Sequence, residues 1–215
     1  MNITLLTDSI NSWFIPFGER LNREMSNLGH VVKYVHKKQD IERGDVCFLL
    51  SCSRIIEESY LSLNKNNIVV HASDLPSGKG FAPLQWQILE GKNEIVLTLF
   101  EVVKEVDAGP FYFKDKLEFD GTELYDELRC KLGKKIIEMC LRFIKERDTL
   151  KPVEQVGPES FFHRRGRKDD ELDVYKTIAE QFNHLRIADN DKYPLYFKYL
   201  GQTYLIKIYR DDSNA

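Results

Sequence analysis

The sequence predicts an α/β protein with a Rossmann-like, mainly parallel sheet, followed by a small C-terminal helix and β-hairpin. Short apolar runs alternate with helical patterns along the first half of the chain, as in βαβ units. The run over residues 45–50 (DVCFLL) is almost uniformly apolar, which is typical of a strand buried on both faces. Near the end, residues 193–210 form an apolar segment that turns at Gly201, which indicates the hairpin.

The first elements follow from spacing and from stop signals. Strands are expected over residues 2–7, 31–36, 45–50 and 68–71 because each is a short apolar run. A helix is expected over residues 17–28, where apolar side chains recur at helical spacing and Gly29 follows as a stop signal. Residues 54–61 predict a further short helix.

The second half continues the pattern with a helix over 83–90 and strands over 95–103 and 109–119. Asp120 or Thr122 is the expected cap of a long helix. The apolar stripe on that helix predicts core packing, and it consists of Leu124, Leu128, Leu132, Ile136, Met139 and Phe143. Tyr175, Ile178, Ala179 and Phe182 predict one amphipathic helix before the hairpin.

Length and composition predict a catalytic core over residues 1–150 and an extension over residues 151–215. With 42% hydrophobic residues, the chain has the composition of an ordinary globular protein. Its net charge is −3 and it has no long basic run, so the sequence does not indicate a nucleic-acid-binding surface. The N-terminus has no signal-peptide pattern, and no stretch is apolar enough for a membrane span. We therefore expect a cytoplasmic protein with no membrane partner.

Four cysteines are present without a CxxC pair, so neither a structural metal nor disulfides are expected. They are interpreted as small apolar residues in a reducing compartment. A basic cluster lies at Arg164, Arg165, Arg167 and Lys168. It is either a solvated charged loop or a contact for a phosphate or nucleotide, and its position alone favours the loop.

His71 and Asp107 are the candidate catalytic residues. His71 ends the strand 68–71, where ligands bind in parallel α/β sheets, and a Pro- and Gly-rich loop follows it. Asp107 lies in the loop between two strands, just before Gly109. A carboxylate beside an imidazole favours the protonated ring and fixes its tautomer. Such a pair can accept a proton in one step and return it in the next.

This region resembles the 10-formyltetrahydrofolate-dependent formyltransferases. The resemblance is carried by an ordered set of elements over most of residues 1–145. The set is His71, Ser73, Leu75–Pro76, Gly80, Pro83 and Val106–Asp107–Ala108–Gly109. The interval of 36 residues from His71 to Asp107 agrees with the family's spacing. The resemblance implies the formyltransferase fold and 10-formyltetrahydrofolate as formyl donor, with no metal.

One position departs from the family pattern. The family's asparagine, two residues before the histidine, falls on Val69 here. In the family it donates a hydrogen bond to the developing oxyanion, a contact worth about 10²–10³ in rate. Asn67 lies too far back along the strand to replace it. Protonated His71, Ser73, Gln85 or a backbone N–H could take that role.

The resemblance also implies where the folate binds. Its pterin is expected against backbone groups of two loops, with Asp107 completing the cofactor site. The loop residues are Ser53, Arg54, Ile55, Ile56, Val102, Val103, Lys104 and Glu105. Ile55 and Ile56 are equally consistent with core packing.

The second half looks most like the nucleotide-sugar N-formyltransferases of the pseudaminic-acid-pathway type. This implies a nucleotide-linked 4-amino-4,6-dideoxy sugar as acceptor, in surface glycan biosynthesis. The expected substrate-binding residues are Ser9, Ser12, Trp13, Lys79 and Gly80. Trp13 is equally interpretable as core, and Lys79 as a solvated loop residue.

Alternatives remain open. The acceptor could be glycinamide ribonucleotide or methionyl-tRNA. The protein could instead hydrolyse 10-formyltetrahydrofolate, or bind folate without turnover. The alternation of Tyr204, Ile206 and Ile208 fits a homodimer through the hairpin, and it fits cover for the chain's own core equally well.

Overall fold

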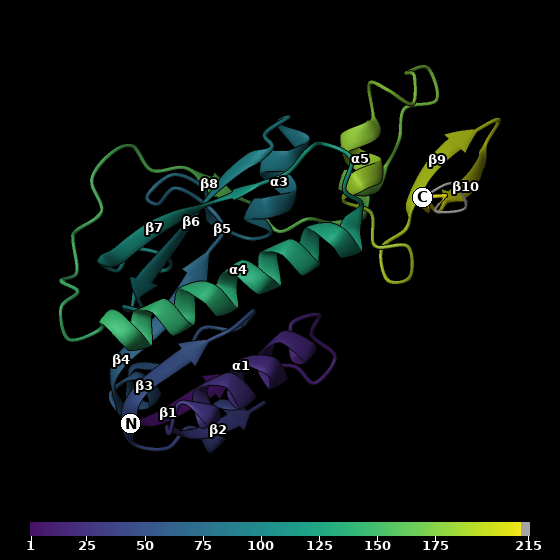
Figure 1. Cartoon of the computed structure of the whole chain (residues 1–215). Helices are drawn as coiled ribbons and strands as arrows, with labels where there is room; N and C mark the ends of the chain where they lie inside the picture. Colours follow the sequence, from purple (N-terminus) through teal and green to yellow (C-terminus); the bar gives the residue numbers. More distant parts are fainter. Residues whose placement is uncertain (212–215) are drawn as a thin grey trace.

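The computed structural model describes residues 1–211 as a six-stranded sheet flanked by helices, with a separate C-terminal hairpin (Figure 1). The sheet runs in the order β2-β1-β3-β4-β6-β7. Its strands are β1 (Asn2–Leu6), β2 (Val31–Val35), β3 (Gly44–Leu49), β4 (Asn64–His71), β6 (Glu94–Glu101) and β7 (Phe111–Glu118). The first four are parallel, whereas β6 and β7 are antiparallel to their neighbours. The predicted mainly parallel α/β fold is confirmed.

Apolar clusters cover both faces of the sheet. The larger one joins α1 (Ile15–Asn27), α3 (Pro83–Leu89) and α4 (Tyr125–Glu146) to the strands. Burying these side chains is the main stabilising contribution, at about 25 cal/mol per Å² of apolar surface. The smaller cluster holds α2 (Glu58–Leu61) on the other face. The stripe predicted on the long helix is buried there as core packing, at Leu128, Leu132, Ile136, Met139 and Phe143.

Strand β4 is longer than the sequence indicated because its polar first half is hydrogen-bonded. The Glu101 carboxylate accepts bonds from the Asn66 side-chain amide and from Tyr112 Oη, at 3.0 and 2.8 Å. Asn67 Nδ2 donates to the carbonyl oxygen of Leu61 at 2.9 Å. Buried polar groups with partners are tolerated inside a sheet, and His71 is therefore held at the end of an eight-residue strand.

Two helix predictions were wrong. The helix expected around Tyr175 begins instead at α5 (Phe182–Arg186), and Tyr175 and Ile178 are 93% and 75% exposed. Their helical spacing is typical of an amphipathic helix, but neither side chain is packed against the core. The long helix starts at Tyr125 after Leu124, and Asp120 with Thr122 forms a separate turn upstream.

The cysteines fit their interpretation as small apolar residues. All four are free, and burial raises the pKa of the Cys47 and Cys52 thiols to about 12. Both groups are therefore protonated near neutral pH and are poor nucleophiles.

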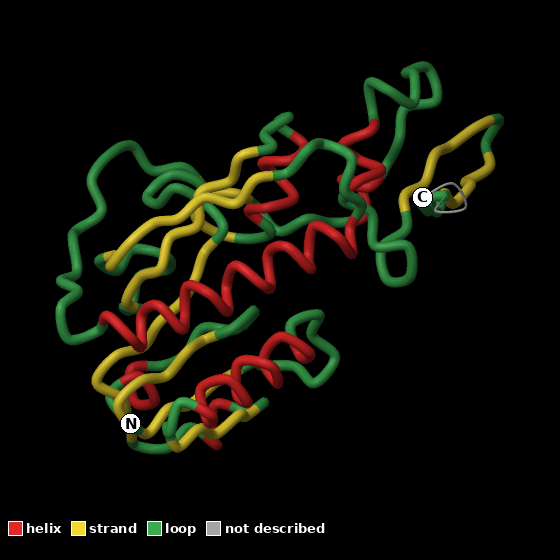
Figure 2. Tube along the Cα trace, viewed as in Figure 1, coloured by secondary structure: helices red, strands yellow, loops and turns green. Residues whose placement is uncertain are grey.

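The C-terminal part includes the short strand β8 (Phe161–Phe162), the turn η2 (Arg167–Asp170), α5, and the hairpin of β9 (Leu195–Tyr199) and β10 (Gln202–Ile206). The chain returns from α4 to β8 through a long loop (Figure 2). Ile206 and Ile208 pack against the hairpin's own apolar cluster with Leu172, Leu185 and Leu195. Tyr204 stacks on Phe197 and is 46% exposed. Within residues 1–211, no helix is both long and apolar enough to cross a membrane.

Candidate active site

His71 lies where the sequence placed it, at the carboxyl end of β4. Its side chain is buried, and its Nε2 is 2.8 Å from the carbonyl oxygen of Gly78. A carbonyl only accepts hydrogen bonds, so Nε2 carries a proton in this arrangement. The lone pair of the neutral ring is then on Nδ1.

Asp107 faces that Nδ1 atom. The distance from His71 Nδ1 to Asp107 Oδ2 is 3.9 Å, and the two side chains are 9% and 15% exposed. The same Oδ2 accepts a hydrogen bond from the Gly80 N–H at 2.9 Å. A proton on Nδ1 would therefore lie next to the carboxylate oxygen of Asp107. The two residues proposed from the sequence are thus adjacent.

The loop that carries Asp107 has a constrained backbone. Asp107 has a φ of 51°, in the left-handed region that non-glycine residues seldom adopt. At Gly109, a Cβ would lie 1.7 Å from the Glu101 carbonyl oxygen, so only glycine fits there. Such outliers persist where surrounding contacts hold them, and they are common at functional sites.

Val69 is half-buried in the smaller apolar cluster, on the strand face it shares with His71. The Asn67 side-chain amide donates to the carbonyl oxygen of Leu61. Ser73 was one of the residues expected to replace the family's asparagine. It is 1% exposed, and its Oγ has no hydrogen-bond partner within residues 1–211.

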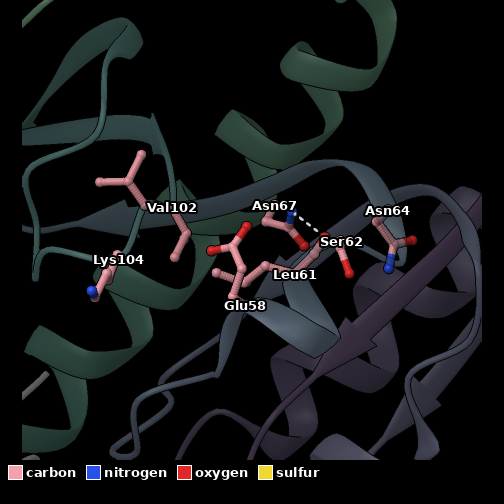
Figure 3. Close-up of a pocket in the computed structure, with 8 residues that line it drawn as sticks. Glu58, Leu61, Ser62, Asn64, Asn67, Val102 and Lys104 are labelled. Carbon is pink, nitrogen blue, oxygen red and sulfur yellow. Dashed lines mark hydrogen bonds between the residues drawn. The ribbon is translucent and has the colours of Figure 1, made fainter.

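A pocket of about 310 Å³ opens beside β4 and the loop after β6 (Figure 3). It includes three of the predicted folate residues, Val102, Val103 and Lys104, together with Asn67 and the acidic side chain of Glu58. In Figure 3 the Glu58 carboxylate points between Val102 and Asn67, whereas the Lys104 amine points away. His71 lies four residues after Asn67 on β4, which is about 13 Å from Asn67 at the usual strand rise.

The other predicted folate residues, Ser53 to Ile56 and Glu105, are not among the residues that line this pocket. The backbone N–H groups of Ser53 and Arg54 donate to Asp8 Oδ2 at 2.7 and 3.0 Å. Ile55 is 70% exposed, while Ile56 is buried in the smaller apolar cluster. Glu105 is exposed. Asp8 was not singled out from the sequence, yet it fixes the loop that follows β3.

Residues of the loop after β1 lie at the same edge of the sheet. Ser9 Oγ accepts from the Asn11 N–H, and Ser12 Oγ donates to Ser51 Oγ at 3.4 Å. Trp13 packs on the core, edge to face against Phe14 and Phe17. The Arg129 guanidinium lies over the Trp13 ring, 5.4 Å from its centre, so a cation contacts one face of the indole.

Lys79 is not a solvated loop residue. It is 3% exposed, and its amine lies 2.6 Å from Glu159 Oε1. Gly80 has a φ of 97°, and a Cβ there would lie 2.4 Å from the Phe162 carbonyl oxygen. Both residues are fixed by β8, which pairs with β5 (Lys79–Gly80).

The basic cluster of the tail is largely engaged within the protein. Arg165 pairs with the buried Asp170 at 2.5 Å. Arg167 lies over the Tyr196 ring and donates to the Pro194 carbonyl oxygen at 2.7 Å. Arg164 lies over Phe81, 4.8 Å from the ring centre. These contacts agree with the interpretation as a charged loop better than with a phosphate site.

The family model described as "Formyl transferase" matches residues 21–142 of the chain. The methionyl-tRNA formyltransferase of Thermotoga maritima is 28% identical over 165 residues. That alignment covers 73% of this chain and 53% of the relative, so the chain spans about half the length of that protein.

Solved structures agree in fold. A methionyl-tRNA formyltransferase from Clostridium thermocellum superposes with a TM-score of 0.83 at 21% identity, over 100% of this chain and 95% of that one. A 4-N formyltransferase from Francisella tularensis gives 0.75 at 16% identity, over 98% of both chains. HypX from Aquifex aeolicus in complex with tetrahydrofolic acid gives 0.77 at 18% identity, over 96% of this chain and 37% of that one. At such identities the superpositions show a shared fold. The family model, in contrast, matches more than half of the sequence, and the chain therefore belongs to the formyl transferase family.

Proposed function

We propose that the protein is an enzyme that transfers a formyl group from 10-formyltetrahydrofolate to an amine, with His71 and Asp107 as its catalytic residues. The observation that carries this proposal is the adjacency of the two side chains at the carboxyl end of β4. Family membership supplies the reaction class.

The residues suggest a division of roles. The amine, as free base, attacks the formyl carbon, and its surplus proton passes to Nδ1 of His71. The Asp107 carboxylate stabilises the resulting imidazolium, and its bond from Gly80 keeps it in place. The proton is then delivered to the folate nitrogen as the carbon–nitrogen bond to the donor breaks. Acid–base help of this kind contributes about 10²–10⁴ in rate.

The pocket beside β4 is the proposed site of the pterin ring. Val102, Val103 and Lys104 are among its lining residues, and Glu58 supplies an acceptor for ring N–H groups. Val102 lines this pocket and belongs to the same apolar cluster as Val69, which lies between Asn67 and His71 on β4. The folate would extend along this apolar wall and bring its formyl group toward His71.

A nucleotide-linked 4-amino-4,6-dideoxy sugar is the proposed acceptor. Trp13 follows β1, and the Arg129 guanidinium lies over its ring, so an aromatic side chain and a cation lie together at the proposed acceptor site. The structural likeness to a 4-N formyltransferase agrees with this acceptor class.

Methionyl-tRNA is the second candidate acceptor, because the curated relative described above is a methionyl-tRNA formyltransferase. Electrostatics count against it. The net charge is −3, and the basic side chains Arg165 and Arg167 are held within the protein. A tRNA ligand ordinarily requires exposed cations to neutralise phosphates.

A panel assay tests the proposal. The protein is incubated with 10-formyltetrahydrofolate and either nucleotide-linked amino sugars, glycinamide ribonucleotide or charged initiator tRNA. Tetrahydrofolate release and acceptor mass are then followed. One amino sugar that gains a formyl group is the expected result. Formate release without an acceptor would identify a hydrolase, and folate binding without turnover would identify a binding module.

A further inference from the structure

Residues 153–163, here called the strap, contact both loops of the proposed catalytic pair. The strap begins against β7, where Val153 and Phe111 exchange backbone hydrogen bonds of 2.9 and 2.8 Å. It ends at β8, which pairs with β5 in the loop after His71. Figure 1 shows the chain returning from α4 past the β6–β7 end of the sheet to reach β8. The strap lies outside the segment matched by the family model.

Gln155 holds the loop of Asp107 from this side. Its Nε2 donates to the carbonyl oxygens of Asp107 and Gly109, at 3.0 and 2.7 Å. These two acceptors flank the turn in which Asp107 has its left-handed backbone. Because that conformation is unfavourable for aspartate, contacts that hold the turn also decide where the carboxylate points.

Ser160 holds the loop of His71. Its Oγ accepts from the Gly78 N–H at 2.8 Å, and its carbonyl oxygen accepts from the Lys79 N–H at 2.9 Å. The carbonyl oxygen of Gly78 in turn accepts the hydrogen bond from His71 Nε2. The strap therefore fixes the backbone group that sets the imidazole tautomer.

The strap contributes little to the core. Val153, Val156 and Phe161 are 53%, 86% and 63% exposed, so the strap buries few apolar side chains. Its hydrogen bonds join the two loops, while Phe162 stacks on Trp86 of α3. We propose that the strap is a positioning element for the catalytic pair, with Gln155 as the residue that keeps Asp107 in reach of His71. This inference rests on the proposed formyl transfer.

The test uses the full chain with Gln155→Met, which keeps the side-chain length and removes the donor, and Gln155→Glu, which replaces it with an acceptor. Gln181→Ala is the matched control, because Gln181 also donates to backbone carbonyl oxygens, but in the loop before α5. We expect kcat to fall about 10²-fold in both Gln155 variants, as for a misplacement of about 1 Å. KM for both substrates and the melting temperature should stay near the wild-type values.

A second readout does not depend on turnover. The ring nitrogen resonances of His71, which report its tautomer and its carboxylate neighbour, should move in Gln155→Met and stay fixed in Gln181→Ala. If the wild type transfers no formyl group, the proposed function fails while this measurement still decides the positioning role. Unchanged resonances together with a kcat within twofold of wild type would overturn the inference. If Gln155→Met does not fold, Gln155→Glu is compared with the wild type by the same two criteria.

Discussion

The Nδ1 atom of His71 faces Asp107 Oδ2 at 3.9 Å, while its Nε2 is already bound to the Gly78 carbonyl oxygen. The two ring nitrogens therefore have different roles. Nε2 keeps its proton and fixes the ring, and Nδ1 is the atom that can accept a proton next to a carboxylate. The Gly78 contact thus fixes the tautomer of the His71 ring, and the Asp107 carboxylate lies beside its basic nitrogen, Nδ1.

Asp107→Asn should lower kcat by about 10²–10⁴-fold with little change in the melting temperature. The amide oxygen can still accept from the Gly80 N–H, and asparagine tolerates a positive φ. It cannot stabilise a protonated His71. Steady-state kinetics and a thermal melt check this, with Asp74→Asn as control because Asp74 is an exposed loop residue paired with Lys114. A variant that keeps wild-type kcat would remove Asp107 from the proposed mechanism.

Ser73→Ala tests the substitute for the family's asparagine. The Ser73 hydroxyl is buried and unpartnered within residues 1–211, so its removal should leave stability nearly unchanged. If it donates to the developing oxyanion, kcat should fall about 10²-fold. Adding Val69→Asn to that variant should restore part of the rate. A Ser73→Ala enzyme with full activity would point to His71, Gln85 or a backbone N–H as the donor.

Lys79→Met separates a structural role from substrate binding, for a lysine that the sequence suggested as a substrate-binding residue, through the acceptor's phosphate. Because Lys79 is 3% exposed and paired with Glu159, we expect the substitution to lower the melting temperature and to leave KM for the acceptor within twofold. Lys92→Met, at an exposed lysine paired with Glu90, is the control. A large rise in KM without loss of stability would instead support phosphate binding.

Much of the fold could be predicted from the sequence because its apolar spacing is local information. The stripe on α4 and the uniformly apolar β3 both lie where spacing placed them. His71 and Asp107 could be proposed as catalytic residues because each residue ends or follows a strand within an ordered set of motifs. These signals require no knowledge of distant partners.

Other features depend on contacts between distant segments. The strand was predicted to begin only at residue 68 because the partners of Asn66 and Asn67, Glu101 and Leu61, are not visible in the local pattern. Gln155 lies in a polar stretch that resembles a linker, yet it holds a turn 48 residues away in sequence. Arg186 looks like a surface residue of a short helix and is 1% exposed. The pairing of such groups decides their burial, and composition does not reveal it.

The ion pair of Glu123 with Arg186 connects the C-terminal part to the core. The Arg186 Nη2 atom lies 3.1 Å from Glu123 Oε2, and the two side chains are 2% and 4% exposed. Burial alone would raise the pKa of the Glu123 carboxyl, but hydrogen bonds from Lys131 and from the N–H groups of Asp120 and Gly121 outweigh it. The pKa is therefore lowered overall.

A lowered pKa in the folded state means that the carboxylate stabilises the protein above the pKa of the unfolded chain. This contribution is lost as the pH falls through the lower folded value. Glu123→Gln should reduce the free energy of unfolding by about 3–5 kcal/mol at pH 7, because it leaves the buried Arg186 without its charged partner. The difference from the wild type should shrink below about pH 4.3, where the unfolded carboxyl begins to be protonated.

Urea unfolding at pH 7 and at pH 3 measures both effects. Glu19→Gln is the control, since Glu19 is exposed on α1 and loses the same charge. Arg186→Met combined with Glu123→Gln should recover part of the stability, because the uncompensated charge is then removed as well. A destabilisation by Glu123→Gln that stays constant down to pH 3 would show that the carboxylate charge is not what joins the two parts.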